Sequence, residues 1–336
     1  MDVFTLDKLP REVLAKIDLQ TAFMASRCII AAERFQLFRK LQGKELTAAE
    51  ICRAVRMKKE KGLFFLAALQ SLGLLKRKGD KYRNSPLAER YFIRERSIFW
   101  TRRYSEECIE EYRAFSVLEE MLTTGRGFES ILGIKRQWYM EKIESDPDWA
   151  RDFTHMLYYH HLDVAKAMAE TIDLTGYQNL LDVGGGSGVI SLALARRFPD
   201  LTATVLDLEP VCRTAKQIIR REKMTGRVKT KVGDMTRGIP SGYDVIMFCD
   251  AGDTSVETLS RVFDLLPDQG MIVFADSFSS EDFTQPFVRL MWQLRSTTPW
   301  LVTHKEVMVR LRQAGFKSVK RRRLTTDMWL VAGVKK

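Results

Sequence analysis

The sequence predicts an α/β protein: a doubly wound, mostly parallel sheet in the second half of the chain, preceded by a mainly helical winged-helix domain. Three observations predict this fold class. An apolar stretch runs into a glycine-rich turn at 180–188, strands and helices alternate from residue 201 to residue 334, and residues 20–84 show the pattern of three helices followed by a hairpin.

The glycine-rich turn is the most specific of these features. Gly184, Gly186 and Gly188 are spaced Gly-x-Gly-x-Gly, so the third glycine comes one position earlier than in the dinucleotide fingerprint. Glycine adopts positive φ at little cost and has no Cβ, which lets a ligand approach the backbone closely. A helix expected over about 187–198 directs its amide-rich N-terminus at the same place. The turn therefore predicts a cofactor site at the end of its strand.

A carboxylate follows the next predicted strand, 201–206. Asp207 closes this strand 19 positions after Gly188, where a carboxylate can accept hydrogen bonds from both hydroxyls of a ribose. Further strands are expected over 227–232, 243–248, 270–275, 317–322 and 328–334, with a helix over 305–314. Ligands in such sheets bind at the carboxyl ends of the strands. The candidate residues at these ends are Gly184–Gly188, Asp207, Asp234, Cys249 and Asp276.

The first half of the chain carries the order helix, helix, helix, wing. The helices are expected over about 20–41, 47–54 and 58–72, and the hairpin over 74–84. DNA-reading winged helices have the same order, and their third helix projects polar residues into a groove. Here residues 61–72 are almost wholly apolar after the first turn, which suits burial against another subunit better than DNA.

The composition indicates an ordinary globular protein of 336 residues, 45% hydrophobic and 29% charged. It contains no apolar run long enough for a membrane span, and its N-terminus lacks the pattern of a secretory signal. The five cysteines are scattered without Cys-x-x-Cys spacing, which favours reduced thiols in the cytoplasm over a disulfide framework or a zinc site. The net charge of +11 is spread evenly over both halves, so we expect a solvated basic surface and no nucleic-acid partner.

The segment Asp182–Gly188, Asp-Val-Gly-Gly-Gly-Ser-Gly, resembles motif I of class I S-adenosylmethionine-dependent methyltransferases. Within them it is similar to the small-molecule O-methyltransferases of the plant caffeate and bacterial secondary-metabolite types. The first half resembles the dimerisation domain of the same family on the segments 32–38, 47–51, 69–75 and 85–91, and the whole resemblance covers about 20–335.

This resemblance implies that the chain is divided into three regions. A winged-helix dimerisation domain is expected over 1–95, a helical connector that roofs the substrate site over 96–170, and a Rossmann-like, seven-stranded cofactor-binding domain over 171–336. The implied reaction is methyl transfer from S-adenosylmethionine, which leaves S-adenosylhomocysteine, to a small, aromatic metabolite. O-methylation is favoured, by a homodimer joined through the N-terminal domain.

The resemblance also implies most of the cofactor site. In the family an Asp-Met pair lies at adenine and an aromatic residue lies over the cofactor, positions that Asp234, Met235 and Phe153 match here. The residues expected to bind the cofactor are Phe153, Asp182, Gly184, Gly186, Gly188, Asp207, Leu208, Asp234, Met235, Phe248 and Cys249.

The family's catalytic histidine has no counterpart in this sequence. Family members carry it in a His-Asp motif after the fourth strand, where residues 248–255 contain no histidine. Counting forward from Asp244 puts Asp253 in its place, whereas counting back from Pro267 puts Phe248 there. The candidates for proton removal are Asp250, Asp253 and His160.

Further side chains complete the predicted site. Asp276 and Glu306 match the two acids that flank the histidine in the family. A flat, apolar acceptor would suit aromatic neighbours, and a carboxylate on it would suit an arginine. The side chains expected to contact the acceptor are Tyr159, Trp292 and Arg295, with Arg289 on the same expected helix.

The missing histidine leaves other functions open. The acceptor could be acidic enough to need only proximity, the reaction could be C- or N-methylation, or the sulfonium could serve non-transfer chemistry. Another alternative is a winged-helix binding protein whose second half senses S-adenosylmethionine. We expect no metal, because His155 and His160, five apart on a helix predicted over 152–170, do not share a face.

Overall fold

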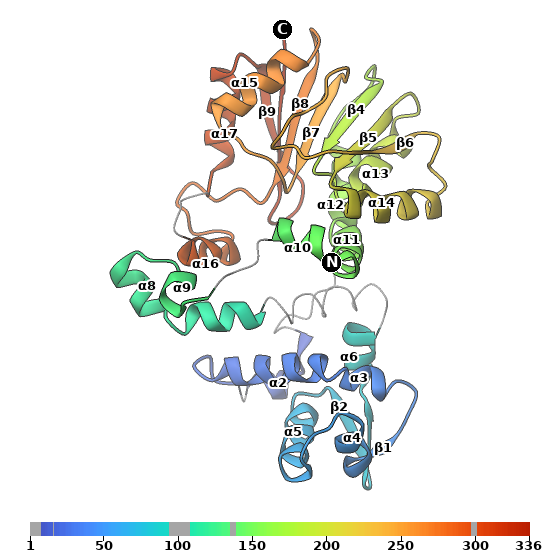
Figure 1. Cartoon of the computed structure of the whole chain (residues 1–336), viewed down its shortest axis with the longest axis vertical. Coiled ribbons are helices and arrows are strands. Elements are labelled where there is room, and N and C mark those ends of the chain that lie inside the picture. The colour runs from blue at the N-terminus through green and yellow to red at the C-terminus, as the bar shows by residue number, and fades with distance from the viewer. Residues whose placement is uncertain (1–7, 16, 94–107, 135–138, 297–300) are drawn as a thin grey trace. The chain divides into compact units, whose positions relative to one another are not determined.

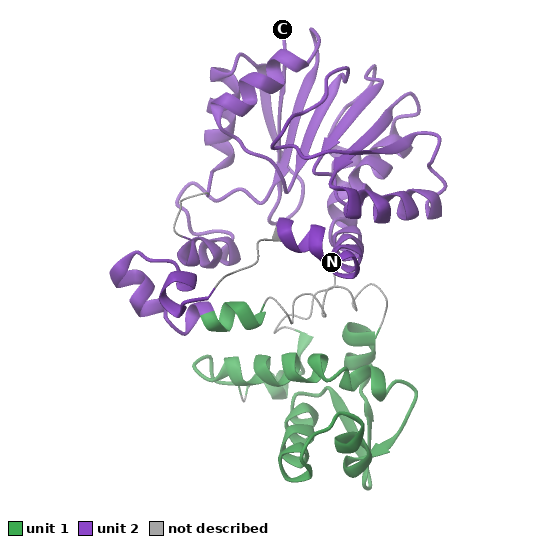
Figure 2. Cartoon of the chain, viewed as in Figure 1, with its two compact units in different colours: residues 1–113 green, residues 114–336 purple. Residues whose placement is uncertain are grey.

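The computed structural model describes residues 8–15, 17–93, 108–134, 139–296 and 301–336. The chain divides into two compact units, residues 1–113 and 114–336 (Figures 1 and 2). The predicted domain boundary between residues 95 and 96 lies outside the described residues.

The first unit is built from short helices and a three-stranded sheet of order β1-β3-β2. Its described elements are α1 Arg11–Leu14, α2 Ala22–Arg34, α3 Leu37–Lys40, β1 Leu46–Thr47, α4 Ala48–Ala54, α5 Lys59–Ser71, β2 Leu75–Lys78, β3 Lys81–Asn84, α6 Pro86–Ala88 and a π-helix Glu89–Ile93. The predicted hairpin is confirmed, because β2 and β3 pair antiparallel with Lys78 opposite Lys81. The predicted helix over 20–41 is not continuous, because Gln36 adopts a left-handed φ of 52° between α2 and α3.

Helix α5 buries only one side within this unit. Leu66 and Leu69 are fully buried in its core. By contrast, Leu63 and Phe64 on the same helix are 42% and 77% exposed, and Phe23 on α2 is 51% exposed. Both helices therefore present large apolar side chains outside the core of their own unit.

The second unit contains a seven-stranded sheet of order β6-β5-β4-β7-β8-β10-β9. The strands are β4 Asn179–Val183, β5 Thr202–Asp207, β6 Val228–Val232, β7 Val245–Cys249, β8 Met271–Asp276, β9 Lys317–Arg323 and β10 Trp329–Val334. Strands β4 to β8 are parallel, whereas β10 runs antiparallel to both β8 and β9. The predicted doubly wound, mostly parallel sheet is confirmed. The chain fills one side of β4 before it crosses to β7, so the switch point lies between these two strands.

Helices cover both faces of this sheet (Figure 1). The described helices are α8 Leu118–Thr124, α9 Phe128–Leu132, α10 Tyr139–Ser145, α11 Pro147–His160, α12 Leu162–Thr171, α13 Val189–Arg197, α14 Glu209–Arg221, α15 Val256–Leu265, α16 Phe287–Arg295 and α17 His304–Gln313. Side chains of α12, α13 and α14 share one hydrophobic cluster with the sheet, and those of α15 and α17 share another. Leu180 joins the first cluster and Leu181 the second, as the alternation of a strand requires. Among the described residues, no helix is long and apolar enough to cross a membrane.

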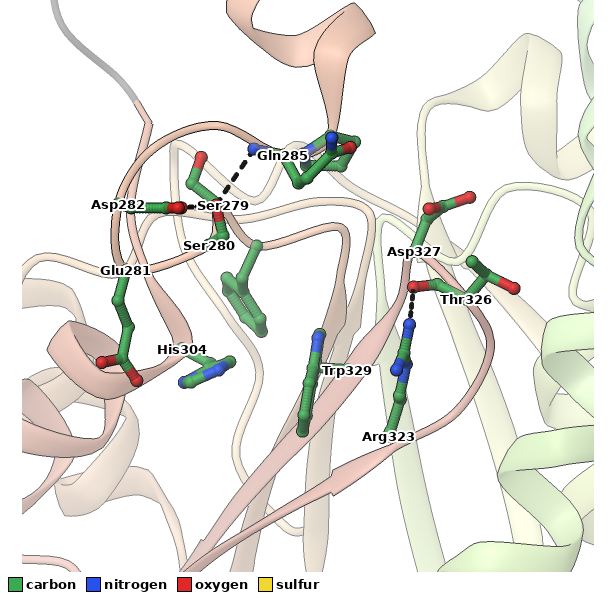
Figure 3. A pocket seen from close by; sticks show the side chains of 12 residues that line it. Ser279, Ser280, Glu281, Asp282, Gln285, His304, Arg323, Thr326, Asp327 and Trp329 are labelled. Carbon is green, nitrogen blue, oxygen red and sulfur yellow. Dashed lines mark hydrogen bonds between the residues drawn. The ribbon is translucent and has the colours of Figure 1, made fainter.

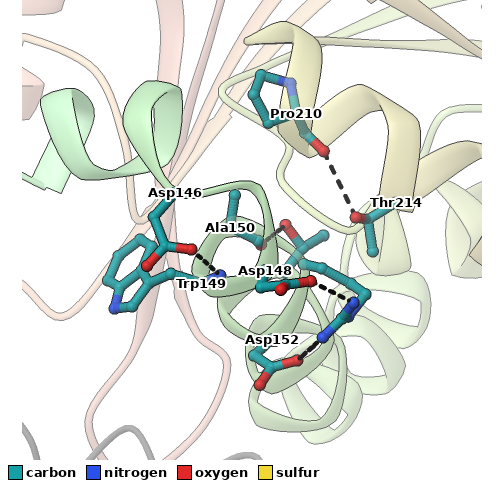
Figure 4. A network of polar contacts seen from close by, with 9 residues as sticks. Asp146, Asp148, Trp149, Ala150, Asp152, Pro210 and Thr214 are labelled. Atoms are coloured by element: carbon teal, nitrogen blue, oxygen red, sulfur yellow. Dashed lines mark hydrogen bonds and ion pairs between the residues drawn. The ribbon is translucent and has the colours of Figure 1, made fainter.

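Helix α11 begins at the capping residue Asp146 (Figure 4) and ends one residue before α12. The Asp146 carboxylate accepts a hydrogen bond from the backbone N–H of Trp149 at 3.0 Å, and Pro147 is the first helical residue. The chain leaves the helical conformation at His161, where φ is −92° and ψ is 6°. The prediction of one continuous helix over 152–170 is therefore wrong at His161.

Candidate active site

The glycine-rich turn joins β4 to α13 and is left-handed at three positions. Gly184, Gly186 and Gly188 have φ values of 66°, 55° and 74°, in the region that favours glycine. Gly188 is also the N-cap of α13, so the first N–H groups of this helix lie beside the turn. The turn thus presents bare backbone and a helix N-terminus at the carboxyl end of β4.

Three neighbouring elements enclose this turn. A Cβ on Gly184 would lie 3.0 Å from the Cβ of Ala251, in the loop after β7, and 3.7 Å from the sulfur of Met235. A Cβ on Gly186 would lie 3.3 Å from Leu157 Cδ1, which belongs to α11. The loop after β7, the turn after β6 that carries Met235, and helix α11 therefore meet at the glycine turn.

Asp182 supports the turn from inside the protein. Its side chain is fully buried, and its Oδ2 accepts a hydrogen bond from the Ser191 hydroxyl of α13 at 2.7 Å. A Cβ on Gly185 would lie only 2.5 Å from Asp182 Cγ, so the turn fits directly over this carboxyl. Burial raises the pKa of Asp182 to about 6. The structure therefore places this predicted cofactor residue beneath the turn.

Asp207 ends β5 and holds the glycine turn through its side chain. Its Oδ2 accepts a hydrogen bond from the backbone N–H of Gly186 at 2.9 Å, and its Oδ1 accepts one from the N–H of Leu208 at 2.8 Å. Burial raises the pKa of Asp207, although these two hydrogen bonds oppose the rise. Because an ionised carboxylate has about four acceptor positions, Asp207 keeps capacity for a ligand's hydroxyls.

Phe153 and Leu208 lie against one small hydrophobic cluster. The buried members of this cluster are Ile143, Trp149, Ala150 and Val211. The Phe153 ring stacks on Trp149 with centroids 4.9 Å apart and planes at 12°. The structure thus brings the predicted aromatic residue of α11 to the cluster that also contacts the residue after Asp207.

Asp234 and Met235 follow β6 on a polar turn. Asp234 Oδ1 accepts hydrogen bonds from the N–H and the hydroxyl of Thr236, at 2.9 Å and 2.6 Å. These hydrogen bonds lower the pKa of Asp234. Met235 packs against the second hydrophobic cluster and reaches the glycine turn. The thioether of Met235 thus lies beside the glycine turn, and the lowered pKa keeps the neighbouring Asp234 carboxylate ionised at neutral pH.

Phe248 and Cys249 are buried residues of β7 with opposite orientations. Phe248 stacks on Phe274 with ring centroids 4.9 Å apart and belongs to the cluster beneath α15 and α17. Cys249 belongs to the cluster beneath α12 and α13, and burial raises the pKa of its thiol well above the usual value. The structure places Phe248 in the core, and Cys249 is the last residue of the strand.

Asp250 lies at the centre of a charged network just after β7. Its Oδ1 accepts a hydrogen bond from Arg289 Nη2 of α16 at 2.9 Å, and its Oδ2 lies 3.8 Å from His161 Nε2. Arg289 Nη2 also donates to Asp276 Oδ1, at the end of β8, at 2.5 Å. The guanidinium that could have held an acceptor carboxylate therefore pairs with two acids of the chain itself.

The two aspartates of this network differ in their protonation. Burial acts to raise the pKa of Asp250, but His161 and Arg289 outweigh it and hold the value at about 2. Burial raises the pKa of Asp276 to about 6; the charge of Arg289 opposes this rise and that of Asp250 adds to it. At neutral pH Asp250 is therefore firmly ionised, whereas Asp276 titrates near neutrality.

Asp253 and Glu306 bind residues at the N-termini of α15 and α17, whose N-cap residues are Ser255 and Thr303. Asp253 accepts hydrogen bonds from the backbone N–H of Ser255 at 2.9 Å and from the hydroxyl of Thr258 at 2.7 Å. Glu306 forms a capping box with Thr303, whose N–H donates to Glu306 Oε2 at 2.7 Å. Both carboxylates therefore serve helix starts, and neither joins the network around Asp250.

The remaining predicted residues lie on α11 and α16. Burial lowers the pKa of His160 to about 4, and its ring lies edge-to-face on His161, with centroids 4.7 Å apart. Tyr159 packs against the first hydrophobic cluster. Trp292 and Arg295 are half-buried on α16, where Trp292 follows Arg289 by three residues and so shares its side of the helix.

Two members of the network had no predicted role in proton transfer. His161 was part of a continuous helix in the prediction, and only its position at the helix break directs it to Asp250. Arg289 was a candidate for a ligand carboxylate. No local sequence signal marks either residue, because their partners are distant in the sequence. Arg289 contacts acids 39 and 13 positions away, and His161 contacts Asp250, which is 89 positions away.

A separate cavity of about 530 Å³ opens beside the start of β10 (Figure 3). Its lining includes Ser279, Asp282, Arg323 and Trp329, and none of the predicted site residues. Several of its polar groups are hydrogen-bonded to neighbouring residues. The Ser280 hydroxyl donates to Asp282 Oδ1 at 2.6 Å, and Arg323 Nη2 donates to the backbone carbonyl of Thr326 at 2.7 Å. We assign this cavity no part in the reaction.

The glycine turn after the first parallel strand, the aspartate that closes the second and the Asp-Met pair after the third define a class I S-adenosylmethionine-dependent methyltransferase on this sheet order. The solved structure of PigF with SAH has this fold: it superposes with a TM-score of 0.80 at 20% identity and covers 95% of this chain and 100% of that one.

The comparison of sequences gives the family. Residues 115–317 match the O-methyltransferase domain, and residues 17–94 match the O-methyltransferase dimerisation domain. The chain belongs to the O-methyltransferase family. It is 28% identical to a 3-hydroxy-5-methyl-1-naphthoate 3-O-methyltransferase of Streptomyces sahachiroi, over 95% of this chain and 94% of the relative. It is 26% identical to an N,N-dimethyltransferase, OxyT, of Streptomyces rimosus, over 95% of both chains.

These findings confirm the predicted enzyme class and cofactor. The chain is an S-adenosylmethionine-dependent methyltransferase, and methyl transfer is supported over the alternatives of non-transfer chemistry and of a cofactor-sensing binding protein.

Proposed function

We propose that this enzyme methylates a hydroxyl group of a small, aromatic metabolite and acts as a homodimer. The observation that carries the proposal is the convergence of the glycine turn, Asp207 and the Asp250 network at the carboxyl ends of four neighbouring strands. This arrangement provides a cofactor cradle and, next to it, charged groups that can receive a proton.

The residues present fit S-adenosylmethionine. Gly184 and Gly186 leave backbone where a Cβ would meet neighbouring side chains, and Asp207 can accept hydrogen bonds from ribose hydroxyls. Asp234 is proposed to accept from the adenine amine, with Met235 against the ring. When bound, the cofactor supplies an electrophilic methyl group, and the chain's residues orient the acceptor and receive its proton.

A naphthoate-like acceptor is the class we favour. The relative from Streptomyces sahachiroi is named for 3-hydroxy-5-methyl-1-naphthoate, and two half-buried aromatic side chains, Tyr159 and Trp292, lie on the helices that flank the Asp250 network. Arg295 is proposed to pair with a carboxylate of the acceptor, since Arg289 is committed to Asp250 and Asp276.

The homodimer is proposed on the dimerisation-domain match and the exposed apolar helices of the first unit. Phe64 and Phe23 are 77% and 51% exposed, and a second copy would cover such side chains. Residues 1–95, 96–170 and 171–336 are proposed as the dimerisation, connecting and cofactor-binding parts. A cytoplasmic location is proposed, since the five cysteines are scattered through the sequence without Cys-x-x-Cys spacing. Light scattering at micromolar concentration tests the dimer, and a monomer's mass would overturn it.

The cofactor site is tested by calorimetry with S-adenosylhomocysteine. Asp207→Ala should weaken binding by about tenfold or more, because it removes charge-assisted hydrogen bonds to ribose and to Gly186. The matched control is Asp200→Ala, an exposed acid in the turn before β5, which should leave the affinity unchanged. Equal affinities of both variants and wild type would refute the ribose assignment.

The acceptor class is tested with labelled methyl groups. Wild type is incubated with methyl-labelled S-adenosylmethionine and a panel of hydroxynaphthoates, other phenols and aromatic amines. We expect label on the oxygen of hydroxyaromatic acids. Label on amines alone, or on none of the panel, contradicts the proposed function.

A further inference from the structure

The network around Asp250 brings together residues of four separated elements. His161 lies between α11 and α12, Asp250 follows β7, Asp276 ends β8, and Arg289 belongs to α16. The His161 side chain is 10% exposed and that of Arg289 15%, whereas Asp250 is 39% exposed. The network is thus mostly buried and opens through Asp250 at the ends of two adjacent parallel strands, where such sheets hold reacting groups.

The backbone at Asp250 is held in an unusual conformation. Its φ of 51° is left-handed, which few residues other than glycine adopt, and its N–H donates to the carbonyl of Ala275 at 2.9 Å. The next residue, Ala251, abuts the glycine turn. The fold therefore turns the chain sharply just where the Asp250 carboxylate meets His161 beside the cofactor cradle.

We propose that His161 and Asp250 form a histidine–carboxylate dyad in which His161 removes the proton from the acceptor hydroxyl, and that Arg289 positions Asp250 within it. The inference rests on the proposed methylation of a hydroxyl and deepens it. The dyad supplies, from the junction of α11 and α12, the imidazole that residues 248–255 lack. His161 is the catalytic residue; Asp250 and Arg289 are positioning residues.

The proposed step moves one methyl group and one proton. The hydroxyl oxygen forms a bond to the methyl carbon, the carbon–sulfur bond breaks, and its electron pair stays on sulfur. The hydroxyl proton passes to Nδ1 of His161, while Nε2 keeps its own proton toward Asp250. The Asp250 carboxylate stabilises the imidazolium that results.

The distance between the two groups sets a condition on this step. At 3.8 Å, Nε2 and Oδ2 are within ion-pair range but too far apart for a hydrogen bond. The pair must therefore close by about 1 Å, or include one water, when ligands bind, as catalytic hydrogen bonds commonly do.

Other candidate groups fit the role less well. His160 has a pKa lowered to about 4 by burial, so its ring is a weak proton acceptor. The Asp253 carboxylate receives hydrogen bonds from the start of α15. Asp276 is bound by Arg289 and by the N–H of Ser277. His161 is the histidine whose Nε2 lies within ion-pair range of the ionised Asp250 carboxylate.

The first test needs no acceptor. A crystal structure of the full chain with S-adenosylhomocysteine should show His161 Nε2 within hydrogen-bond distance of Asp250 Oδ2, directly or through one water, and Nδ1 facing the space beside the sulfur. A ring whose Nε2 reaches Asp250 by neither route overturns the inference, even if the cofactor binds as proposed.

The second test compares histidine variants of α11 and its end. His161→Gln should lower kcat on the best hydroxyaromatic probe by roughly 10²- to 10⁴-fold, the usual contribution of a general base. Its affinity for S-adenosylhomocysteine should stay at the wild-type value, which shows that the fold is intact. The matched control His155→Gln, on the same helix, should keep kcat. Added imidazole should restore part of the activity of His161→Gly, which a merely structural histidine would not allow.

The third test separates positioning from folding. Asp250→Asn and Arg289→Ala should each lower kcat by roughly tenfold or more with little change in KM, and Arg289→Lys should recover part of the loss by keeping the cation. Loss of cofactor affinity and of kcat together in these variants would instead indicate a structural role and overturn the positioning assignment.

The outcomes distinguish the two proposals. If wild type methylates no hydroxyl, the proposed function is wrong, and so is the role of the dyad as a base for a hydroxyl. The crystal structure of the first test decides independently whether His161 and Asp250 pair. If hydroxyls are methylated but His161→Gln retains full activity, or His160→Gln alone loses it, the dyad is wrong and the proposed function stands.

Discussion

Replacement of Gly185 by alanine tests how tightly the glycine turn fits over Asp182. The backbone φ of Gly185 is not left-handed, so an alanine meets no conformational barrier there. Its Cβ would, however, lie 2.5 Å from Asp182 Cγ and 2.7 Å from Oδ2, and Oδ2 accepts the Ser191 hydrogen bond inside the core. Asp182 cannot move away without giving up this hydrogen bond.

The magnitude follows from these contacts. Overpacking a core commonly lowers stability by about 1–3 kcal/mol, and a hydrogen bond to a charged group contributes about 1.5–3 kcal/mol. If Asp182 moves to relieve the clash, it loses the hydrogen bond, so the two contributions are not fully additive. We therefore expect the free energy of unfolding to fall by about 2–4 kcal/mol. For a unit of this size each kcal/mol lowers Tm by roughly 2–4 °C.

The assay is thermal and urea unfolding of the full chain, with Gly226→Ala as the matched control. A Cβ at Gly226 meets no atom within 4 Å and the backbone is ordinary, so this change should lie within about 0.5 kcal/mol of wild type. In an Asp182→Ala background most of the penalty of Gly185→Ala should disappear. If Gly185→Ala and Gly226→Ala unfold alike, or if the penalty persists without Asp182, the reasoning is refuted.

Two further changes test buried charge and helix capping. The raised pKa of Asp182, about 6, means that its contribution to stability is full at low pH and is lost as the pH rises through about 6. Asp182→Asn cannot ionise, so its free energy of unfolding relative to wild type should rise by about 2–2.5 kcal/mol between pH 4 and pH 7.5 in urea unfolding; an equal pH dependence of both proteins would contradict this. Asp146→Ala removes the hydrogen bond to the Trp149 N–H and should lower the free energy of unfolding by about 1 kcal/mol in the same assay, against no change if the cap is immaterial.

Features with local causes could be predicted from the sequence. The left-handed turn follows from glycines at alternate positions, and the Thr47–Glu50 capping box forms as its spacing indicates, with the Thr47 N–H donating to Glu50 Oε2 at 2.7 Å. Asp207 was predicted from the length of one helix and one strand after the turn, and it hydrogen-bonds to Gly186 in the structure. In each case the residues that decide the outcome lie on one short segment or on adjacent strands.

Features that depend on several elements could not be predicted. Phe248 is the residue at which one of the two counts placed the missing histidine, yet the alternation of β7 turns its ring into the core beneath α15 and α17. Counting residues does not place the side chains of residues 250–253, because the loop is irregular: Asp250 and Gly252 have φ values of 51° and 90°, and Gly252 lies against the Phe248 ring. His161 becomes part of the site only because one residue interrupts two helices that sequence periodicity joins.

Helix α11 has a consequence for any attempt to exchange acceptor specificity between relatives. Along one rigid rod, Phe153 meets the cluster beside Leu208, Leu157 meets the glycine turn, and the helix stops so that His161 meets Asp250. Insertion of a single residue would rotate everything after it by about 100° and advance it by about 1.5 Å, and these contacts would fall out of register. Chimeric enzymes should therefore take α11 and the turn from the same parent, and length variation should be tolerated only outside this rod.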